Sequence, residues 1–292
     1  MQHYYLLLHS MNFKQLEQYF IDEITSPYGE DEARQLFFMV TEHLTGWNRG
    51  QQVININHLL TAEQETAYQN ILAELKQERP LQHILSESWF YGLKFKVTPA
   101  VLIPRPETEE LVDWILQTAI TVKIEIKKLL DIGTGSGCIA ISLKKNMALI
   151  EVNALDISEE ALAVARENAI SNGTDINFIH SDILTYNSEV KYDLIVSNPP
   201  YITEEERGDM HRNVLDYEPH LALFVSNENP LLFYKHIADF AIRQLNPKGK
   251  LFFEINEYLG KETTEMLNLK GFKNIILRKD MQGKDRMICC NL

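Results

Sequence analysis

The sequence has few cysteines, no long apolar run and a deficit of positive charge. Its three cysteines are Cys138 and the adjacent pair Cys289 and Cys290, which matches neither a disulfide framework nor a zinc site. We therefore predict three buried free thiols. No apolar run approaches the roughly 18 residues of a membrane helix, and residues 4–8 are too short, with no cationic lead, for a signal peptide. These absences predict a cytoplasmic protein with no membrane contact.

Acidic residues outnumber basic ones. Lysine and arginine total 28 against 41 aspartate and glutamate residues, for a formal net charge of -13. This balance argues against a sequence-independent grip on nucleic acid phosphates, although a local basic patch is compatible with it. Internal repeats and low-complexity segments are also missing. With 45% hydrophobic residues, the 292-residue chain has enough apolar material for two domains.

The first 80 residues have a helical pattern. Apolar residues recur at helical spacing in two stretches, and a third helix begins at Thr61, where Gln64 is placed for a capping box. Glycines and a proline at 26–29 and 46 separate the helices. We predict a small helical bundle over residues 1–80. Its core positions include Phe13, Leu16, Phe20, Ile24, Ala33, Leu36, Phe37, Val40, Leu44, Tyr68, Ile71, Leu72 and Leu75.

The rest of the chain changes character. Residues 81–103 hold short runs rich in aromatic and β-branched residues, which predicts a linker with a hairpin. Over residues 104–292, strand-like and helix-like segments alternate, as is typical of an α/β fold with a doubly wound, mostly parallel sheet and helices on both faces. Pro247-Lys248-Gly249 predicts a turn, and residues 202–221 predict a long loop that is a candidate lid or substrate-docking loop.

A glycine-rich segment, Gly133-Thr134-Gly135-Ser136-Gly137, follows an apolar run. It predicts a strand, a tight turn whose backbone can approach a ligand closely, and a helix start with free N–H groups. Its spacing is GxGxG, because Cys138 stands where the dinucleotide fingerprint GxGxxG has its third glycine. The segment therefore indicates a ligand site, but not the usual site for NAD.

Two acids end or follow the next strand-like runs. Asp156 ends an apolar run nineteen residues after Gly137, where an acid can accept hydrogen bonds from both ribose hydroxyls. Asp156 alone equally fits a cap for a helix near Ser158. Asp182 follows the run 176–179, near the expected position of a base, or it belongs to an ordinary strand-end turn. The glycines and Asp156 together favour a nucleoside cofactor.

The tetrapeptide Asn198-Pro199-Pro200-Tyr201 stops a strand-like run abruptly. Its two prolines remove two N–H donors and fix two φ angles, which leaves a stiff rim of acceptors. The Asn198 side-chain oxygen and the Pro199 carbonyl can both accept from one NH₂ group, and Tyr201 offers a flat apolar face. A lone Asn-Pro pair would merely start a turn. Beside a nucleoside site, the tetrapeptide indicates binding of a planar amine or amide.

The order of these motifs resembles the class I S-adenosylmethionine-dependent methyltransferases that act on planar nitrogen. More narrowly, Ile103-Pro104-Arg105-Pro106-Glu107-Thr108-Glu109 and Tyr217-Glu218-Pro219-His220-Leu221-Ala222-Leu223 resemble segments of the peptide chain release factor glutamine methyltransferases. The resemblance covers nearly the whole chain. It implies a seven-stranded sheet whose antiparallel edge contains the runs 275–277 and 287–289.

The resemblance also implies roles for residues. The helical bundle would recognise the protein substrate, and residues 104–292 would be catalytic and need no metal. Ile183 would flank the adenine by apolar contact, since it stands where some relatives have an aromatic residue. The cofactor-binding set is Gly133, Thr134, Gly135, Ser136, Gly137, Asp156, Asp182, Ile183 and Asn198. The substrate-binding set is Asn198, Pro199, Pro200 and Tyr201, of which Asn198, Pro199 and Tyr201 would be catalytic.

The implied reaction is methyl transfer from S-adenosylmethionine to the side-chain amide nitrogen of glutamine in the Gly-Gly-Gln motif of release factors. The alternative is methylation of an exocyclic amine of adenine in DNA or RNA, because those enzymes share the Asn-Pro-Pro-Tyr motif. The acidic balance weighs against that alternative. The glycine spacing disfavours an NAD-dependent oxidoreductase, and the intact tetrapeptide disfavours a silent binding module. The roles of Arg105, Glu107, Glu109 and Glu218 stay open between substrate contact and anchoring.

Overall fold

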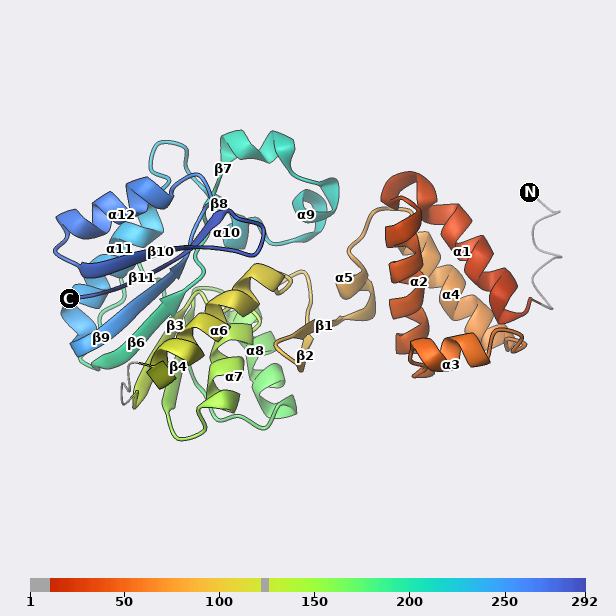
Figure 1. Ribbon diagram of the computed structural model, residues 1–292, viewed down its shortest axis with the longest axis horizontal. Helices are drawn as coiled ribbons and strands as arrows, with labels where there is room; N and C mark the ends of the chain where they lie inside the picture. Colours follow the sequence, from red (N-terminus) through yellow and green to blue (C-terminus); the bar gives the residue numbers. More distant parts are fainter. Residues whose placement is uncertain (1–10, 122–125) are drawn as a thin grey trace. The chain divides into compact units, whose positions relative to one another are not determined.

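The structure is a computed structural model that describes residues 11–121 and 126–292. The chain divides into two compact units (Figure 1). One contains the residues up to Ser86 together with Arg212–Tyr217, and the other contains Glu87–His211 with Glu218–Leu292. None of the helices in the described ranges combines the length and the apolar character that a membrane span requires.

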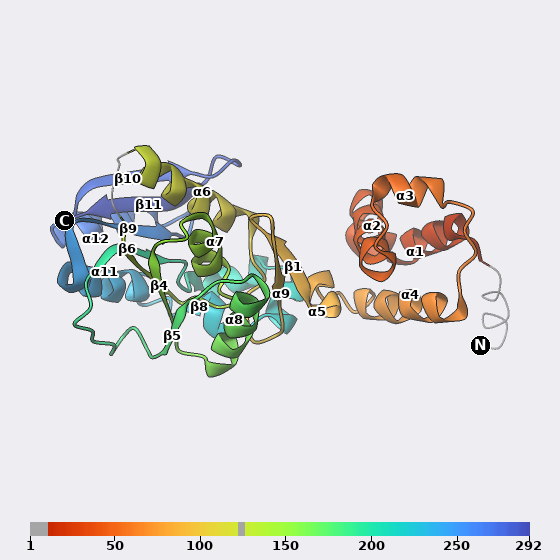
Figure 2. The same ribbon diagram turned by 90° about the horizontal axis from the view of Figure 1, so that it is seen from below.

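The first unit is a helical bundle. Its long helices α1 (Phe13–Tyr28), α2 (Glu30–Thr45) and α4 (Ala62–Leu75) pack side by side, as Figure 2 shows. They bury the aromatic side chains of Phe13, Phe20, Phe37 and Tyr68, as the helical spacing predicted. The predicted capping box at Thr61 is also present. Shorter helices complete the unit, namely α3 (Arg49–Ile54), α5 (Leu81–Leu85) and α9 (Arg212–Tyr217).

The second unit begins with the predicted hairpin, β1 (Glu87–Phe90) and β2 (Leu93–Lys96), followed by helix α6 (Pro106–Thr121). Its main sheet has seven strands, and β11 runs in the direction opposite to that of the other six. The predicted fold class, with the antiparallel strand near one edge, is therefore confirmed. In spatial order the strands are β10 (Lys273–Lys279), β11 (Asp285–Asn291), β9 (Leu245–Glu254), β6 (Tyr192–Ser197), β3 (Lys128–Ile132), β4 (Glu151–Asp156) and β5 (Asn177–His180).

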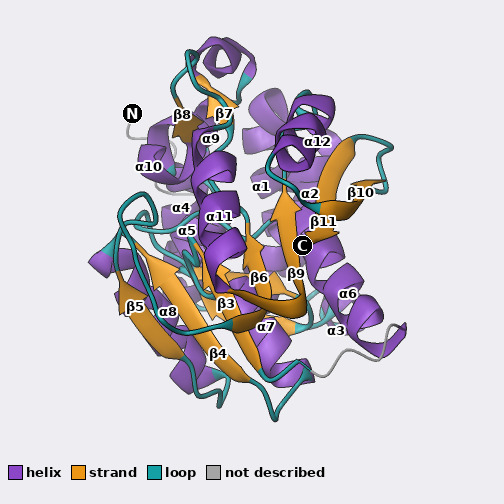
Figure 3. Cartoon of the chain, turned by 90° about the vertical axis from the view of Figure 1, so that its left-hand side faces the viewer, coloured by secondary structure: helices purple, strands orange, loops and turns teal. Residues whose placement is uncertain are grey.

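Helices cover both faces of this sheet (Figure 3). Side chains alternate along each strand, so in β3 Leu129 faces one core and Leu130 the other. The first core is shared with α6, α7 (Cys138–Asn146) and α8 (Glu159–Ser171). The second core is shared with α11 (Leu232–Gln244) and α12 (Gly260–Leu269). The three cysteines are free and buried, as predicted.

Two local predictions were wrong. Residues 202–221 are not an irregular loop, because they contain β7 (Ile202–Thr203), a 3₁₀ helix (Glu204–Asp209), α9 and the start of α10 (His220–Leu223), which leads into β8 (Phe224–Val225). Such elements are too short to show a period, although the Thr203–Glu206 capping box was a readable signal. The predicted turn at 247–249 is a register irregularity within β9.

Candidate active site

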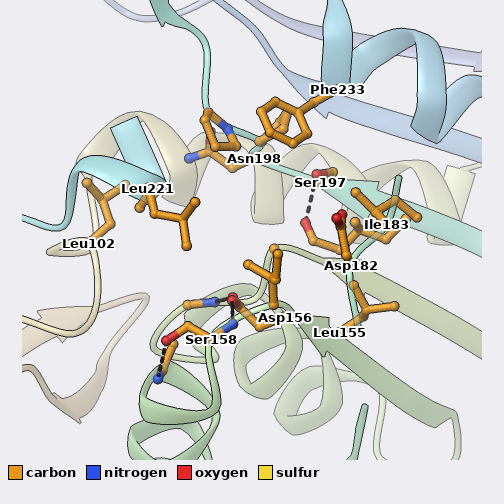
Figure 4. A pocket seen from close by; sticks show the side chains of 18 of the residues that line it. Leu102, Leu155, Asp156, Ser158, Asp182, Ile183, Ser197, Asn198, Leu221 and Phe233 are labelled. Carbon is orange, nitrogen blue, oxygen red and sulfur yellow. Dashed lines mark hydrogen bonds between the residues drawn. The ribbon is translucent and has the colours of Figure 1, made fainter. Parts of the chain in front are cut away.

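A cavity of about 260 Å³ opens at the carboxyl ends of β3, β4, β5 and β6. These strands are parallel neighbours, so their ends meet at one edge of the sheet. The chain extends the sheet from β3 first toward β5 and later toward β9, which makes this edge the topological switch point where α/β folds bind ligands. Figure 4 shows Asp156, Asp182 and Asn198 around the cavity.

The glycine-rich turn forms the floor of the cavity. The N–H groups of Gly133 and Thr134 both donate to the carbonyl of Leu155, at 2.8 and 3.0 Å, which ties the end of β3 to β4. Gly133 and Gly135 line the cavity, and their φ angles of 73° and 54° suit glycine. The Thr134 hydroxyl instead turns inward and donates to the Asp131 carboxylate at 2.7 Å.

The last two residues of the turn, Ser136 and Gly137, pack within the fold and do not line the cavity. Ser136 is buried and, like Thr134 and Gly137, is not among the residues that line the cavity. A Cβ on Gly137 would lie 2.9 Å from Cδ1 of Ile141 and 3.3 Å from Cβ of Ala165. The third glycine is therefore required for close packing between α7 and α8, while the first two are open to a ligand.

Asp156 closes the turn before α8 and also contributes to the cavity wall. One carboxylate oxygen accepts the Gly135 N–H at 2.8 Å and the other accepts the Ser158 N–H at 2.9 Å, which closes the turn before α8. Ser158 itself caps α8. Asp156 also lines the cavity, and burial raises the pKa of its carboxyl. Each oxygen keeps a lone pair for a further donor.

The end of β5 places Asp182 and Ile183 in the cavity wall. Asp182 also forms the strand-end turn, since its carboxylate accepts the Leu184 N–H at 2.9 Å. Sequence reasoning missed Phe233 of α11, which lines the cavity and lies across from Asp156 in Figure 4. Its position in an apolar helix pattern carried no signal that distinguished it from a core residue.

The residues of the predicted acceptor rim lie at the end of β6. The Asn198 side-chain nitrogen donates to the Thr108 hydroxyl at 3.3 Å. No hydrogen bond joins the Asn198 Oδ1 or the Pro199 carbonyl to another of the described residues. Asn198, Pro199 and Pro200 line the cavity, but Tyr201 does not. Two acceptors at this wall are thus available for an NH₂ group.

Tyr201 lies behind this wall. Its hydroxyl is 3.3 Å from Glu254 Oε1, and its carbonyl accepts from Asn256 at 3.0 Å. Burial is the main cause that raises the pKa of Glu254 to about 7, while the Thr108 hydroxyl and the positive charge of Arg286 oppose that rise. Tyr201 also has a raised pKa, mainly through burial. Hydrogen bonds within the fold thus hold both the hydroxyl and the carbonyl of Tyr201.

Two chain segments form the remaining wall, Ala100–Leu102 and Pro219–Ala222. Glu218 ties them together, because its carboxylate accepts the Ile103 N–H at 3.1 Å and pairs with Arg105. Only 1% of the Glu218 side chain is exposed, so this acid anchors the wall. Sequence reasoning noticed the two motifs that contain these segments, but not that they meet.

The acids of the other motif also have partners within the fold. Glu109 accepts the Tyr91 N–H at 2.8 Å at the tip of the hairpin, and Glu107 accepts from the Gln282 side chain at 3.2 Å. Both therefore anchor neighbouring segments. Within the described part of the chain, no group of three or more His, Cys, Asp or Glu side chains is placed to hold a metal ion.

Known proteins match the chain along most of its length. Residues 24–85 match the family described as PrmC N-terminal domain, and residues 113–217 match the Methyltransferase small domain. The release factor glutamine methyltransferase of Flavobacterium psychrophilum is 46% identical over 96% of this chain and 99% of its own length. The chain belongs to the release factor glutamine methyltransferase family. The family predicted from the motifs is thereby confirmed.

Further comparisons agree with this membership. The release factor glutamine methyltransferase of Bacteroides thetaiotaomicron is 42% identical over 90% of this chain and 94% of its own length. A crystal structure of a methyltransferase from Pyrococcus furiosus superposes with a TM-score of 0.52 and 20% identity, over 74% of this chain and 98% of the other. That likeness confirms the fold alone. The release factor glutamine methyltransferase family uses S-adenosylmethionine, so a nucleoside site at the switch point is expected.

Proposed function

We propose that this protein transfers a methyl group from S-adenosylmethionine to the side-chain amide nitrogen of the Gly-Gly-Gln glutamine in peptide chain release factors. Family membership supports the reaction class, and relatives at 46% and 42% identity carry the name of this activity. The observation that carries the proposal is the pair of available acceptors, Asn198 Oδ1 and the Pro199 carbonyl, in the wall of a nucleoside-sized cavity.

The cavity suits S-adenosylmethionine. Asp156 would accept from the ribose hydroxyls, and Asp182 and Ile183 would lie at the adenine, with Phe233 as an additional aromatic contact. Gly133 would approach the methionine part. A Cβ at Gly135 would meet no atom within 4 Å, so the missing side chain leaves room at the floor. In this proposal Thr134, Ser136 and Gly137 shape the turn.

When bound, the cofactor supplies a methyl group activated by its sulfonium, whose sulfur retains the electron pair of the broken C–S bond. An amide nitrogen is a poor nucleophile because its lone pair is delocalised into the carbonyl. Asn198 Oδ1 and the Pro199 carbonyl would accept its two hydrogens, hold the nitrogen in line and favour the positive charge that develops as the N–C bond forms. The surplus proton then leaves the nitrogen for solvent. Orientation of this kind supplies on the order of 7–11 kcal/mol.

The two parts of the chain would divide the work. Residues 1–80 would recognise the protein substrate, and residues 104–292 would bind the cofactor and catalyse the transfer. Residues 81–103 would connect these two parts. The match of residues 24–85 to the PrmC N-terminal domain supports a conserved role for the helical part within this family.

The test is direct. The purified protein is incubated with S-adenosylmethionine and unmethylated release factor, with matched DNA and RNA in parallel, and any added methyl group is located by mass spectrometry. We expect one methyl group on the Gly-Gly-Gln glutamine. Methylation of nucleic acid alone would overturn the proposal and favour the adenine alternative.

A further inference from the structure

The Asn198 side-chain amide can lie in two orientations related by a flip. Its oxygen and NH₂ group have similar sizes, so shape alone does not choose between them. Only the orientation with Oδ1 toward the cavity offers an acceptor to an incoming NH₂ group. In the flipped orientation the Asn198 NH₂ group would face the incoming NH₂ group, and two donors cannot form a hydrogen bond with each other. Something behind Asn198 must therefore select the useful orientation.

Thr108 is in contact with the other end of the amide. Its hydroxyl lies 3.3 Å from Asn198 Nδ2 and donates to Glu254 Oε2 at 2.7 Å. A hydroxyl has one proton, and Glu254 receives it, so only a lone pair of Thr108 remains for Asn198. A lone pair accepts from the NH₂ group and repels Oδ1. Thr108 thereby discriminates between the two orientations of Asn198.

Glu254 is placed to receive that proton. It ends β9, next to β6, and is 1% exposed, so water does not compete for its oxygens. Its second oxygen faces the hydroxyl of Tyr201 at 3.3 Å. An ionised carboxylate only accepts hydrogen bonds, which fixes the direction of every bond in the chain that leads to Asn198.

We propose that Thr108 and Glu254 are positioning residues that orient the Asn198 amide, with Oδ1 toward the glutamine NH₂ group. This inference rests on the proposed function and deepens it. Neither Thr108 nor Glu254 is among the residues that line the cavity, so both would act through Asn198. Thr108 is 3% exposed, so the chain of hydrogen bonds is closed to solvent from Asn198 inward.

The orientation depends on the charge of Glu254. A protonated Glu254 can donate to Thr108, which frees the Thr108 proton for Asn198 Oδ1 and permits the flip. Burial raises the pKa of Glu254 to about 7, so activity rises with pH through that region. The charged and titratable groups around Glu254 are Glu107 of α6, Cys138 of α7, Tyr201, Tyr234 of α11 and Arg286 of β11.

The first test replaces the hydroxyl by a methyl group of the same shape. Thr108→Val should lower kcat for release factor methylation at least about tenfold, with KM for both substrates within about threefold. Thr108→Ser should restore most of kcat. The matched control is Thr263→Val, because Thr263 is buried in α12 and its hydroxyl has no partner among the described residues. Wild-type kcat in Thr108→Val would overturn the proposal.

The second test is independent of release factor. Protein labelled with ¹⁵N-asparagine gives side-chain NH₂ signals, and the Asn198 pair is identified by its loss in Asn198→Ala. We expect Thr108→Val to shift this pair and speed its exchange with water, and Thr263→Val to leave it unchanged. An unchanged pair in Thr108→Val contradicts the proposed orientation. A shifted pair in a protein that fails to methylate release factor would reject the proposed function while the orientation stands.

The third test uses pH. In wild type, kcat should rise about tenfold from pH 6 to pH 8 at saturating substrates. Glu254→Gln retains an acceptor for Thr108 and has no charge to lose, so its profile should be flat over this range. A rise as steep as in wild type would show that Glu254 does not set the orientation.

Discussion

The floor of the cavity and its wall at β6 are held in place by different kinds of hydrogen bond. The floor at β3 and β4 is held mainly by the backbone, with the N–H groups of Gly133 and Thr134 on Leu155 and that of Gly135 on Asp156. The wall at β6 is held by side chains from three segments distant in sequence: Thr108 bonds to Asn198, and Glu254 accepts from both Thr108 and Tyr201. A backbone turn fixes space for a cofactor, whereas a side-chain network fixes the direction of a hydrogen bond.

The floor and the wall at β6 should therefore tolerate different substitutions. The glycine floor depends on the absence of side chains, so added atoms should disturb it. The wall at Asn198 depends on particular donors and acceptors, so changes that keep the shape but alter the polarity should disturb it. Substitutions that change cofactor binding and turnover separately therefore test whether the floor and the wall at β6 have different roles.

The largest expected effect is that of Asn198→Ala. Removal of one of the two acceptors should lower kcat about 100- to 1000-fold, as loss of one preorganised group in a catalytic site typically does. Affinity for S-adenosylhomocysteine, measured by calorimetry, should stay within a few-fold. A comparable loss of cofactor affinity would mean that the wall at β6 also binds the cofactor and that its role is not separate from that of the floor.

Asp156→Asn tests the floor. The amide has one oxygen where the carboxylate has two, so it cannot serve Gly135, Ser158 and a ribose equally well. We expect cofactor affinity to fall about 10- to 100-fold, the equivalent of one or two charge-assisted hydrogen bonds. Calorimetry with S-adenosylhomocysteine measures this. Unchanged affinity would remove Asp156 from the proposed ribose site.

Alanine substitutions at Gly135 and Gly137 should distinguish a glycine that leaves room in the cavity from one that is required for close packing of helices. A methyl group on Gly137 would collide with Ile141 and Ala165, so Gly137→Ala should reduce the free energy of unfolding by about 2 kcal/mol. Gly135→Ala has room, and only its positive φ angle should cost about 1 kcal/mol. Urea denaturation followed by circular dichroism measures both. Equal losses would contradict the division of roles between the two glycines.

The same contrast explains what the sequence alone could predict. The turn at 133–137 and the capping box at Thr61 are readable because each depends on residues a few positions apart. Asn-Pro-Pro-Tyr was readable because its stiffness is local. The family was therefore predictable from short motifs and their order.

Contacts across the fold were not predictable in this way. Thr108 meets Glu254 because α6 packs against β9, and a partner 146 residues away leaves no pattern in either segment. The hydrogen bond from the Tyr201 hydroxyl to Glu254, 53 residues away, belongs to the same network and was equally invisible in the sequence. Phe233 follows a helical pattern that is identical for core and cavity residues.

Each wall also has a buried carboxyl group, and these predict the pH dependence of stability. Burial raises the pKa of Asp131, below the glycine floor, and of Glu254, behind Asn198, each to about 7. A carboxyl with a raised pKa binds its proton more tightly in the folded state. Its favourable contribution is present at low pH and is lost as pH rises through the folded pKa. Each group should therefore lower stability by about 1.4 kcal/mol between pH 6 and pH 8.

Chemical denaturation at pH 6, 7 and 8 checks this expectation. Asp131→Asn and Glu254→Gln should each remove about half of the fall in stability, and the double variant should be nearly flat, since the two groups lie behind different walls. Asp131→Asn should lose some stability at every pH, because its hydrogen bond from Thr134 at 2.7 Å weakens. If neither variant altered the slope, both carboxyls would be ionised throughout this range, and the pH dependence of Asn198 orientation would lose its cause.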